Sequence, residues 1–199
     1  CIILFAPVPA RSMVIHVPND APTIQAGIDL ALDGDVVLVA DGTWVGPGNR
    51  DLDFGGRAIT VRSLNGPSGC IIQCHSLVFD YRGFWFHSGE GADSVLRGFT
   101  ITSGSGNSGG GIRCNAASPT IMDCVITNCT ASFYGGGIYG GNSSPRLVNC
   151  RINSCFANTG GGAYFSGGSP QLENCRLDHN HAQGDTLPPL GGGIYSDSS

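Results

Sequence analysis

Short apolar runs alternate with clusters of Gly, Asp, Asn and Ser along most of this chain. Apolar runs bounded by turn-forming residues are typical of short β-strands. A first strand is expected at residues 14–17, and further strands are expected at residues 36–39, 59–61, 70–72, 84–86, 95–96 and 99–101. The pattern therefore predicts a protein built almost entirely from short strands.

One segment, at residues 23–33, has the apolar spacing of a helix. Thr23 is a suitable N-cap, and Asp33-Gly34-Asp35 is expected to end the helix. The apolar residues on one helical face are Ile24, Ile28, Ala31 and Leu32. A single amphipathic helix ahead of many strands predicts a cap that covers the apolar core and shields the open edge of the first strands.

From residue 109 onward the pattern repeats. Glycine runs begin at Gly109, Gly135, Gly160 and Gly191, and similar Ser-Pro words lie between them. A repeat of about 25 residues indicates a stack of equivalent units that share one core. The last interval is longer, and its extra residues fall in Gly184–Leu190, which has the composition of a loop insertion.

Each repeat also requires a bend. Ile121 and Ile126 are both expected to face the core, but an uninterrupted strand would place them on opposite faces. The bend falls at Asp123, and at Asn149 and Asn174 in the next repeats, because Asp and Asn tolerate a left-handed backbone. Each coil is thus expected to contain a strand, an Asx corner, a second strand, a turn and a glycine-led third strand. This order predicts an all-β, single-stranded parallel β-helix.

The expected organisation is an N-terminal tail at residues 1–13 followed by the β-helix at 14–199. Irregular coils are expected at residues 36–108 and regular coils at 109–199. Because residues 191–199 begin another coil, we expect the chain to be truncated at its C-terminus. Further coils, or another subunit of a self-assembling filament, would stack there.

Several sequence words resemble a known family. They are Ala21-Pro22-Thr23-Ile24-Gln25-Ala26, Asp33-Gly34-Asp35-Val36-Val37-Leu38-Val39 and the later Ser-Pro-Thr-Ile and Gly-Gly-Gly-Ile-Tyr words. The chain resembles exported right-handed parallel β-helix repeat proteins of bacteria, in the pectate-lyase-like superfamily, and more loosely the repeats of chlamydial polymorphic membrane proteins. The resemblance implies a right-handed β-helix and export. It implies no single activity, because lyases, hydrolases, epimerases and adhesins share this fold.

Charge and the N-terminal segment indicate which partners and which cellular location to expect. The net charge is −5, every basic residue is arginine, and no basic run occurs, so no nucleic-acid partner is expected. Residues 1–13 have the pattern of an export-signal remnant, with an apolar stretch and small residues before Arg11. A lipidated Cys1 is the alternative. No apolar run is long enough to span a bilayer, so a secreted or cell-surface location is expected.

The chain has nine cysteines, and five of them recur at equivalent positions of the repeat. Cys124, Cys150 and Cys175 form one ladder, and Cys129 and Cys155 form another. We expect small core thiols, because stacked strands hold Cβ atoms about 4.8 Å apart while disulfides prefer about 3.8 Å. A disulfide between Cys70 and Cys74 is the alternative. Short paired Cys-x-x-Cys spacings do not occur, so no metal site is predicted.

Two sets of polar and aromatic residues are the candidate ligand sites. In three successive coils, the residue that follows each glycine run is expected to face inward, and the next residue is a tyrosine: Tyr139, Tyr164 or Tyr195. Arg113 fills the same position one coil earlier. These tyrosines are expected to stack outside the helix, where they would hold sugar rings or stabilise the sheet. Arg151 is the further candidate for ligand binding.

The candidate catalytic residues are Arg176, Asp178 and His179. A lyase acting on an acidic polysaccharide needs a base near a sugar proton, and calcium would be its cofactor. A solvated charged face is the competing interpretation. The sequence therefore favours an exported, non-enzymatic module without a cofactor, for glycan binding or structural extension. A polysaccharide lyase or hydrolase, with Gly184–Leu190 at its cleft, is the main alternative.

Overall fold

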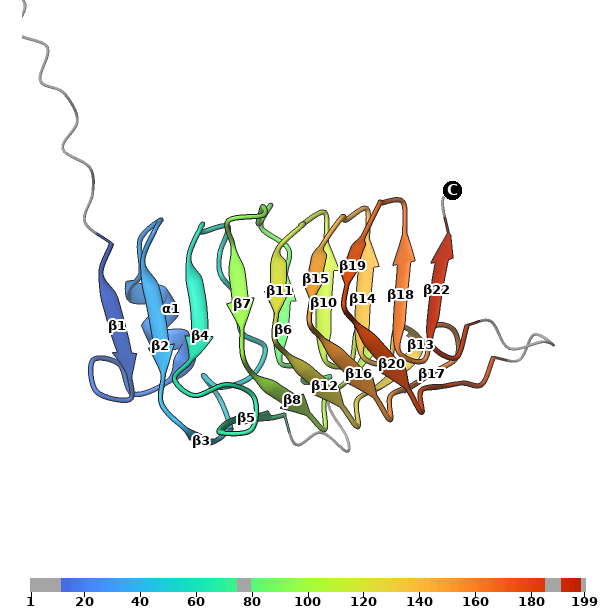
Figure 1. Ribbon diagram of the computed structural model, residues 1–199, viewed down its shortest axis with the longest axis horizontal. Coiled ribbons are helices and arrows are strands. Elements are labelled where there is room, and N and C mark those ends of the chain that lie inside the picture. The colour runs from blue at the N-terminus through green and yellow to red at the C-terminus, as the bar shows by residue number, and fades with distance from the viewer. Residues whose placement is uncertain (1–11, 75–79, 185–190, 198–199) are drawn as a thin grey trace, which may run out of the picture.

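The computed structural model describes residues 12–74, 80–184 and 191–197, and it shows parallel strands stacked along one axis (Figure 1). The predicted signal remnant at residues 1–13 and the predicted insertion at Gly184–Leu190 lie largely outside the described residues. Every named strand pair is parallel, and each strand pairs with its equivalent in the next coil rather than with its neighbour in sequence.

Four sheets run along the axis. Sheet A contains β1 (Val14–Val17), β2 (Val36–Val39), β4 (Thr60–Ser63), β7 (Val95–Arg97), β11 (Thr120–Met122), β15 (Arg146–Val148) and β19 (Gln171–Glu173). Sheet B contains β3 (Gly42–Val45), β5 (Cys70–Gln73), β8 (Thr100–Thr102), β12 (Val125–Thr127), β16 (Arg151–Asn153) and β20 (Arg176–Asp178). Sheet C contains β6 (Phe84–Phe86), β10 (Ile112–Asn115), β14 (Ile138–Gly141), β18 (Ala163–Ser166) and β22 (Ile194–Asp197). Sheet D contains β9 (Ser105–Ser108), β13 (Thr130–Tyr134), β17 (Phe156–Ala157) and β21 (His181–Ala182).

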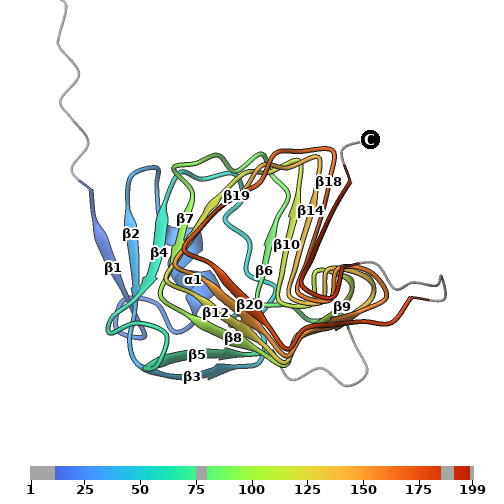
Figure 2. The same cartoon turned by 45° about the vertical axis from the view of Figure 1, so that its right-hand side comes forward.

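The fold is the predicted right-handed parallel β-helix, and sheets A, B and C supply its three predicted strands per coil. Sheet D is an addition, because its short strands occupy the segment that was expected to be a turn between the second and third strands. The longest of them, β13, has mainly exposed side chains, as does β3, so both lack the apolar alternation that marks a strand in the sequence. Figure 2 shows successive coils superposed around a common interior.

Each regular coil turns at single residues with a left-handed backbone. The corner between sheets A and B has φ of 51° at Asp123, 53° at Asn149 and 50° at Asn174, which confirms the predicted bend. The other corners also turn at single residues with a left-handed backbone, but with more varied residue types. They are Ser103, Asn128, Ser154 and His179 between sheets B and D, and Ala116, Asn142 and Gly167 between sheets C and A.

The glycine triads complete the coil at the corner between sheets D and C. The first glycine supplies a left-handed backbone, with φ of 62° at Gly135. The second and third allow close approach between coils. A Cβ on Gly136 would overlap the carbonyl oxygen of Phe156, and one on Gly137 would lie 2.6 Å from the carbonyl oxygen of Gly162. The repeated Gly-Gly-Gly word thus serves two separate steric needs.

The helix α1 (Ile24–Leu30) covers the N-terminal end of the β-helix, as predicted (Figure 1). The Thr23 side chain accepts a hydrogen bond from the Ala26 amide at 3.2 Å, and α1 packs against β1 and β2. The predicted helix was too long. The backbone is already extended at Ala31, and Asp35 accepts a hydrogen bond from the Leu32 amide, so Leu32 is 72% exposed rather than part of the apolar face.

The core is filled by inward-facing aliphatic, aromatic and cysteine side chains. All eight cysteines in the described residues are free thiols, so the alternative of a disulfide between Cys70 and Cys74 is wrong. The predicted ladder of Cys124, Cys150 and Cys175 follows the corner, and each thiol donates to backbone carbonyl oxygens. These thiols therefore act as small core residues with satisfied hydrogen bonds.

Alkylation of the native protein is expected to label Cys175 first among these eight cysteines. Burial raises the pKa of Cys70 and Cys74 to about 12 and that of Cys124 to about 11, so few of these thiols ionise. The neighbouring Cys150 thiol stabilises the Cys175 thiolate and lowers its pKa, and Cys175 is only half-buried.

Peptide mass spectrometry after brief iodoacetamide treatment near neutral pH measures the labelling. Cys155 is the internal control. The Cys129 thiol lowers the pKa of Cys155, but Cys155 is only 1% exposed, so the reagent does not reach it. Equal labelling of Cys155 and Cys175 would mean that the coils open readily.

Candidate functional site

The outer face of sheet C carries one row of aromatic and arginine side chains. Trp85 of β6, Arg113 of β10, Tyr139 of β14, Tyr164 of β18 and Tyr195 of β22 occupy equivalent register positions on successive strands. We call this row the aromatic ladder. It arises because the residues on either side of each member face inward, so strand alternation directs the member outward.

The three tyrosine rings stack as predicted. The centroids of Tyr139 and Tyr164 are 5.8 Å apart with planes 3° apart, and those of Tyr164 and Tyr195 are 5.3 Å apart with planes 15° apart. Arg113 continues the row, since its guanidinium carbon lies 5.6 Å from the Tyr139 ring centroid and 5.7 Å from that of Trp85. The aromatic ladder is therefore continuous over five strands, joined by stacking and cation–π contacts.

Two aromatic residues of sheet D, Phe133 and Tyr134, lie beside the aromatic ladder. They belong to the part of β13 where its register against β9 shifts, between Ala131 and Tyr134. Tyr134 packs against Tyr164 with centroids 4.6 Å apart, and Phe133 lies beside Tyr134 at 6.3 Å. Phe133 is 52% exposed and Tyr134 is 42% exposed, so both add apolar area to the solvent face.

A polar row runs beside the ladder. Asn115, Gly141, Ser166 and Asp197 share one register position, two residues after the ladder residues. Asn115 accepts a hydrogen bond from Arg113 Nε at 2.9 Å, and the Tyr139 ring lies over Gly141, where a Cβ would be 2.7 Å from the tyrosine hydroxyl. Burial, followed by the neighbouring Tyr134, raises the pKa of Tyr164, so its hydroxyl remains a hydrogen-bond donor at neutral pH.

The N-terminal end of the ladder carries basic side chains that pair with carboxylates. The Arg82 guanidinium lies 5.3 Å from the Trp85 ring centroid, and its Nε is 3.7 Å from Asp51 Oδ1. Burial lowers the pKa of Arg82 from its ordinary value. His87 stacks on Trp85 with centroids 4.3 Å apart, and its Nε2 is 3.4 Å from Asp53 Oδ2. Trp85 is thus held between cationic and polar side chains.

The predicted catalytic residues do come together, on sheet B and its corner. Asp178 Oδ2 lies 3.0 Å from Arg151 Nη2, 3.0 Å from Arg176 Nη2 and 3.5 Å from His179 Nδ1. Hydrogen bonding to Arg151 lowers the pKa of Asp178, and the same contact raises the pKa of Arg151. Both arginines are therefore already engaged with one carboxylate.

Three of these residues have evident structural roles. His179 has φ of 56° and occupies the corner position that Ser154 fills one coil earlier, while its side chain is exposed. Arg151 and Arg176 are in register on neighbouring strands, where Asp178 offsets their mutual repulsion. The arrangement has the form of a surface ion-pair network.

Sequence reasoning missed Trp85, Phe133 and Tyr134 as members of the aromatic face. Trp85 had a usable signal, because Gly83-Phe84-Trp85 matches Gly137-Ile138-Tyr139 in the repeat. Phe133 and Tyr134 had none, since they lie in the segment that was expected to be a turn. Arg113 was noted in the same slot but was not included as a ligand-binding residue.

Within residues 12–74, 80–184 and 191–197, no group of three or more His, Cys, Asp or Glu side chains is arranged to hold a metal ion. In the same part of the chain, no helix has the length and apolar character needed to cross a bilayer.

The model of a family described as "Right handed beta helix region" matches residues 55–199. Neither the curated proteins nor the solved structures contain a significant match to the chain. The matched segment contains the aromatic ladder and all of the regular coils.

Proposed function

Because this chain belongs to the right-handed β-helix family and carries an aromatic ladder, we propose that it is an exported, non-enzymatic module that binds an extended glycan along sheet C. The continuous row of stacked rings on the solvent face carries the proposal. The export pattern of residues 1–13 supports a location outside the cytoplasm.

The ladder has the chemistry that sugar rings need. Aromatic rings pack against the C–H surfaces of pyranose rings, and the exposed Phe133 and Tyr134 offer ring surface for this contact. The tyrosines of the ladder are stacked on one another, so they offer ring edges and hydroxyls, which a rigid sheet presents at little entropic cost. The tyrosine rings repeat at 5.8 and 5.3 Å, which provides regularly spaced contacts for an extended chain of sugar rings. Asn115 and Ser166 in the adjacent polar row supply hydrogen-bonding groups for sugar hydroxyls.

A lyase centred on Arg176, Asp178 and His179 has less support. A general base must be able to take a proton, whereas both arginines at this cluster donate to Asp178. A calcium ion at Asp178 would also face two guanidiniums within hydrogen-bonding distance of the same carboxylate. The geometry is better explained by stabilisation of the surface of sheet B.

Replacing Tyr164 with alanine is expected to weaken binding of the recognised polysaccharide by about tenfold or more, because Tyr164 contacts three other rings of the face. Affinity electrophoresis against a panel of neutral and acidic polysaccharides identifies the ligand and measures the loss. Phe156→Ala is the matched control, since Phe156 stacks on His181 in sheet D at 5.5 Å. It should bind as the parent protein does.

An ultraviolet assay for unsaturated sugar products, run with calcium and with a chelator, separates binding from cleavage. Binding without product supports the module. Product formation that is lost in Asp178→Asn but retained in Tyr164→Ala would instead favour the lyase. Equal loss of binding in Tyr164→Ala and Phe156→Ala would remove the aromatic ladder as the binding face.

A further inference from the structure

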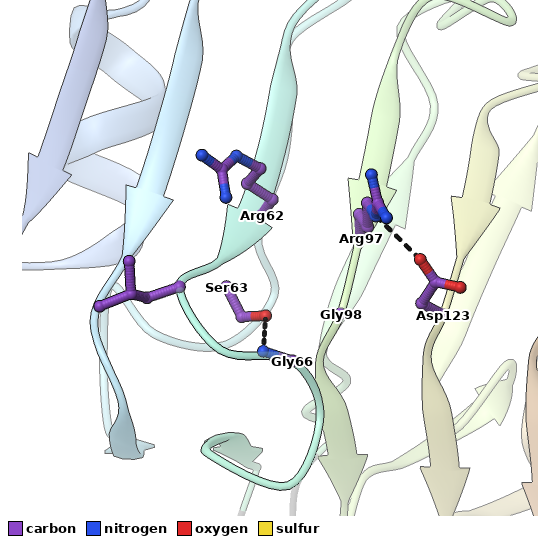
Figure 3. A pocket seen from close by; sticks show the side chains of 7 residues that line it. Arg62, Ser63, Gly66, Arg97, Gly98 and Asp123 are labelled. Atoms are coloured by element: carbon purple, nitrogen blue, oxygen red, sulfur yellow. Dashed lines mark hydrogen bonds and ion pairs between the residues drawn. The ribbon is translucent and has the colours of Figure 1, made fainter.

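A second concave site lies on sheet A, away from the aromatic ladder. It is a pocket of about 260 Å³ lined by Arg62, Leu64, Gly66, Arg97, Gly98 and Asp123 (Figure 3). Arg62 comes from β4 and Arg97 from β7, and the two are directly paired in register. Neither the proposed glycan site nor the ion-pair network on sheet B includes these residues.

The pocket exists because one corner is longer than its equivalents. Regular coils turn from sheet A to sheet B at one residue, such as Gly98 or Asp123, but the chain between β4 and β5 makes a longer loop. The loop is anchored. Ser63 Oγ accepts from the Gly66 amide at 3.0 Å, and Thr100 Oγ1 donates to the Pro67 carbonyl oxygen at 2.8 Å.

The close contact with the next coil requires glycine at position 98. A Cβ on Gly98 would lie 2.5 Å from Ser63 Oγ. The loop between β4 and β5 therefore packs against the coil that carries Arg97, so the backbone of the fold defines the shape of the pocket. Leu64, which is 51% exposed, supplies an apolar patch on this wall.

The pocket has an excess of positive charge, in a protein whose net charge is −5. Arg97 Nε donates to Asp123 Oδ2 at 2.8 Å. Arg62 is half-buried, and within the described part of the chain its side chain makes no hydrogen bond or ion pair to another residue. Two guanidiniums on adjacent strands, about 4.8 Å apart at the backbone, repel each other unless an anion lies between them.

We propose that this pocket binds a tetrahedral oxyanion, a phosphate or sulfate group, between Arg62 and Arg97. Guanidinium groups bind such anions through paired N–H donors, and three terminal oxygens of a monoester suffice for two guanidiniums carried in register by neighbouring strands. A carboxylate offers only two oxygens, which one guanidinium fork occupies. The remaining volume and Leu64 suit the carbon skeleton of a monoester.

Isothermal titration of the full chain at low ionic strength tests the site with four probes: inorganic phosphate, glucose 6-phosphate, glucuronate and glucose. Arg62→Gln is expected to weaken glucose 6-phosphate binding at least about tenfold. Arg146→Gln is the matched control, because Arg146 lies on the same sheet but is paired with Glu173 at 2.9 Å. Binding to this control should be unchanged.

Asp123→Asn is the complementary variant and is expected to tighten binding by up to about fivefold, because it frees Arg97 from its carboxylate. It should fold normally, since Asn149 and Asn174 occupy the equivalent corners with φ of 53° and 50°. Tyr164→Ala should bind the oxyanion as the parent does, which keeps this test independent of the glycan proposal.

Tighter binding of the ester than of inorganic phosphate assigns the pocket to monoesters, and equal binding assigns it to the free ion. Either result supports an oxyanion site. The proposal is overturned if glucuronate binds as tightly as glucose 6-phosphate, if Arg62→Gln binds as the parent does, or if no probe other than glucose binds.

Discussion

Replacing Gly136 with alanine is expected to lower the free energy of unfolding by at least about 3 kcal/mol. The added Cβ would overlap the Phe156 carbonyl oxygen and lie 2.5 Å from the Gly161 carbonyl oxygen. Both atoms belong to the backbone of the next coil, so no side-chain rotation relieves the overlap. The coils would have to separate locally, and the stacked hydrogen bonds between them would weaken.

Urea denaturation followed by circular dichroism measures this loss. Gly91→Ala is the control, because Gly91 is exposed, a Cβ there meets nothing within 4 Å and its backbone is not left-handed. It is expected to change stability by no more than about 0.5 kcal/mol. Similar losses in the two variants would show that Gly136 is not required for close stacking.

Replacing Asn149 with alanine is expected to cost about 2 kcal/mol. Alanine pays about 1 kcal/mol in the left-handed region, and the hydrogen bonds that link the corners are lost. Asn149 Nδ2 donates to Asp123 Oδ1 at 3.0 Å and its Oδ1 accepts from Asn174 Nδ2 at 3.4 Å.

Asn149→Gly separates the two contributions. Glycine adopts φ of 53° without steric cost but cannot make the hydrogen bonds, so about half of the loss is expected to remain. Thermal unfolding of the three proteins gives the order parent, glycine, alanine. A glycine variant that is less stable than the alanine variant would mean that backbone entropy outweighs strain at this corner.

The repeat predicted the regular coils well because equivalent residues must meet equivalent surroundings. Ile121, Ile126 and the Asx corner between them are sufficient to place two strands and a bend. The remaining corners were only partly predictable from residue type. Asn128 and Asn142 are residues that tolerate a left-handed backbone, whereas Ala116 and Ser154 adopt it because closure of the coil requires it, although neither favours this conformation.

The functional surface was predictable where it follows the repeat and not elsewhere. The tyrosine ladder follows from one slot in successive coils. The pocket around Arg62 and Arg97 depends on a long corner within the irregular coils, where register cannot be read from spacing. The cluster at Asp178 was correctly expected to gather Arg151, Arg176 and His179, but only the distances show that the carboxylate is already paired.

The left-handed corners also set how such a chain can change its length over evolution. Each regular coil closes on itself through the same set of corners, so a duplicated or deleted coil would leave the orientation of all others unchanged. Duplication of the coil that carries Tyr164 would add one rung to the aromatic surface without redesigning any neighbour. The length of the aromatic ladder therefore depends on the number of coils. Duplication or deletion of a coil would change this length while the fold and the register of the strands are kept.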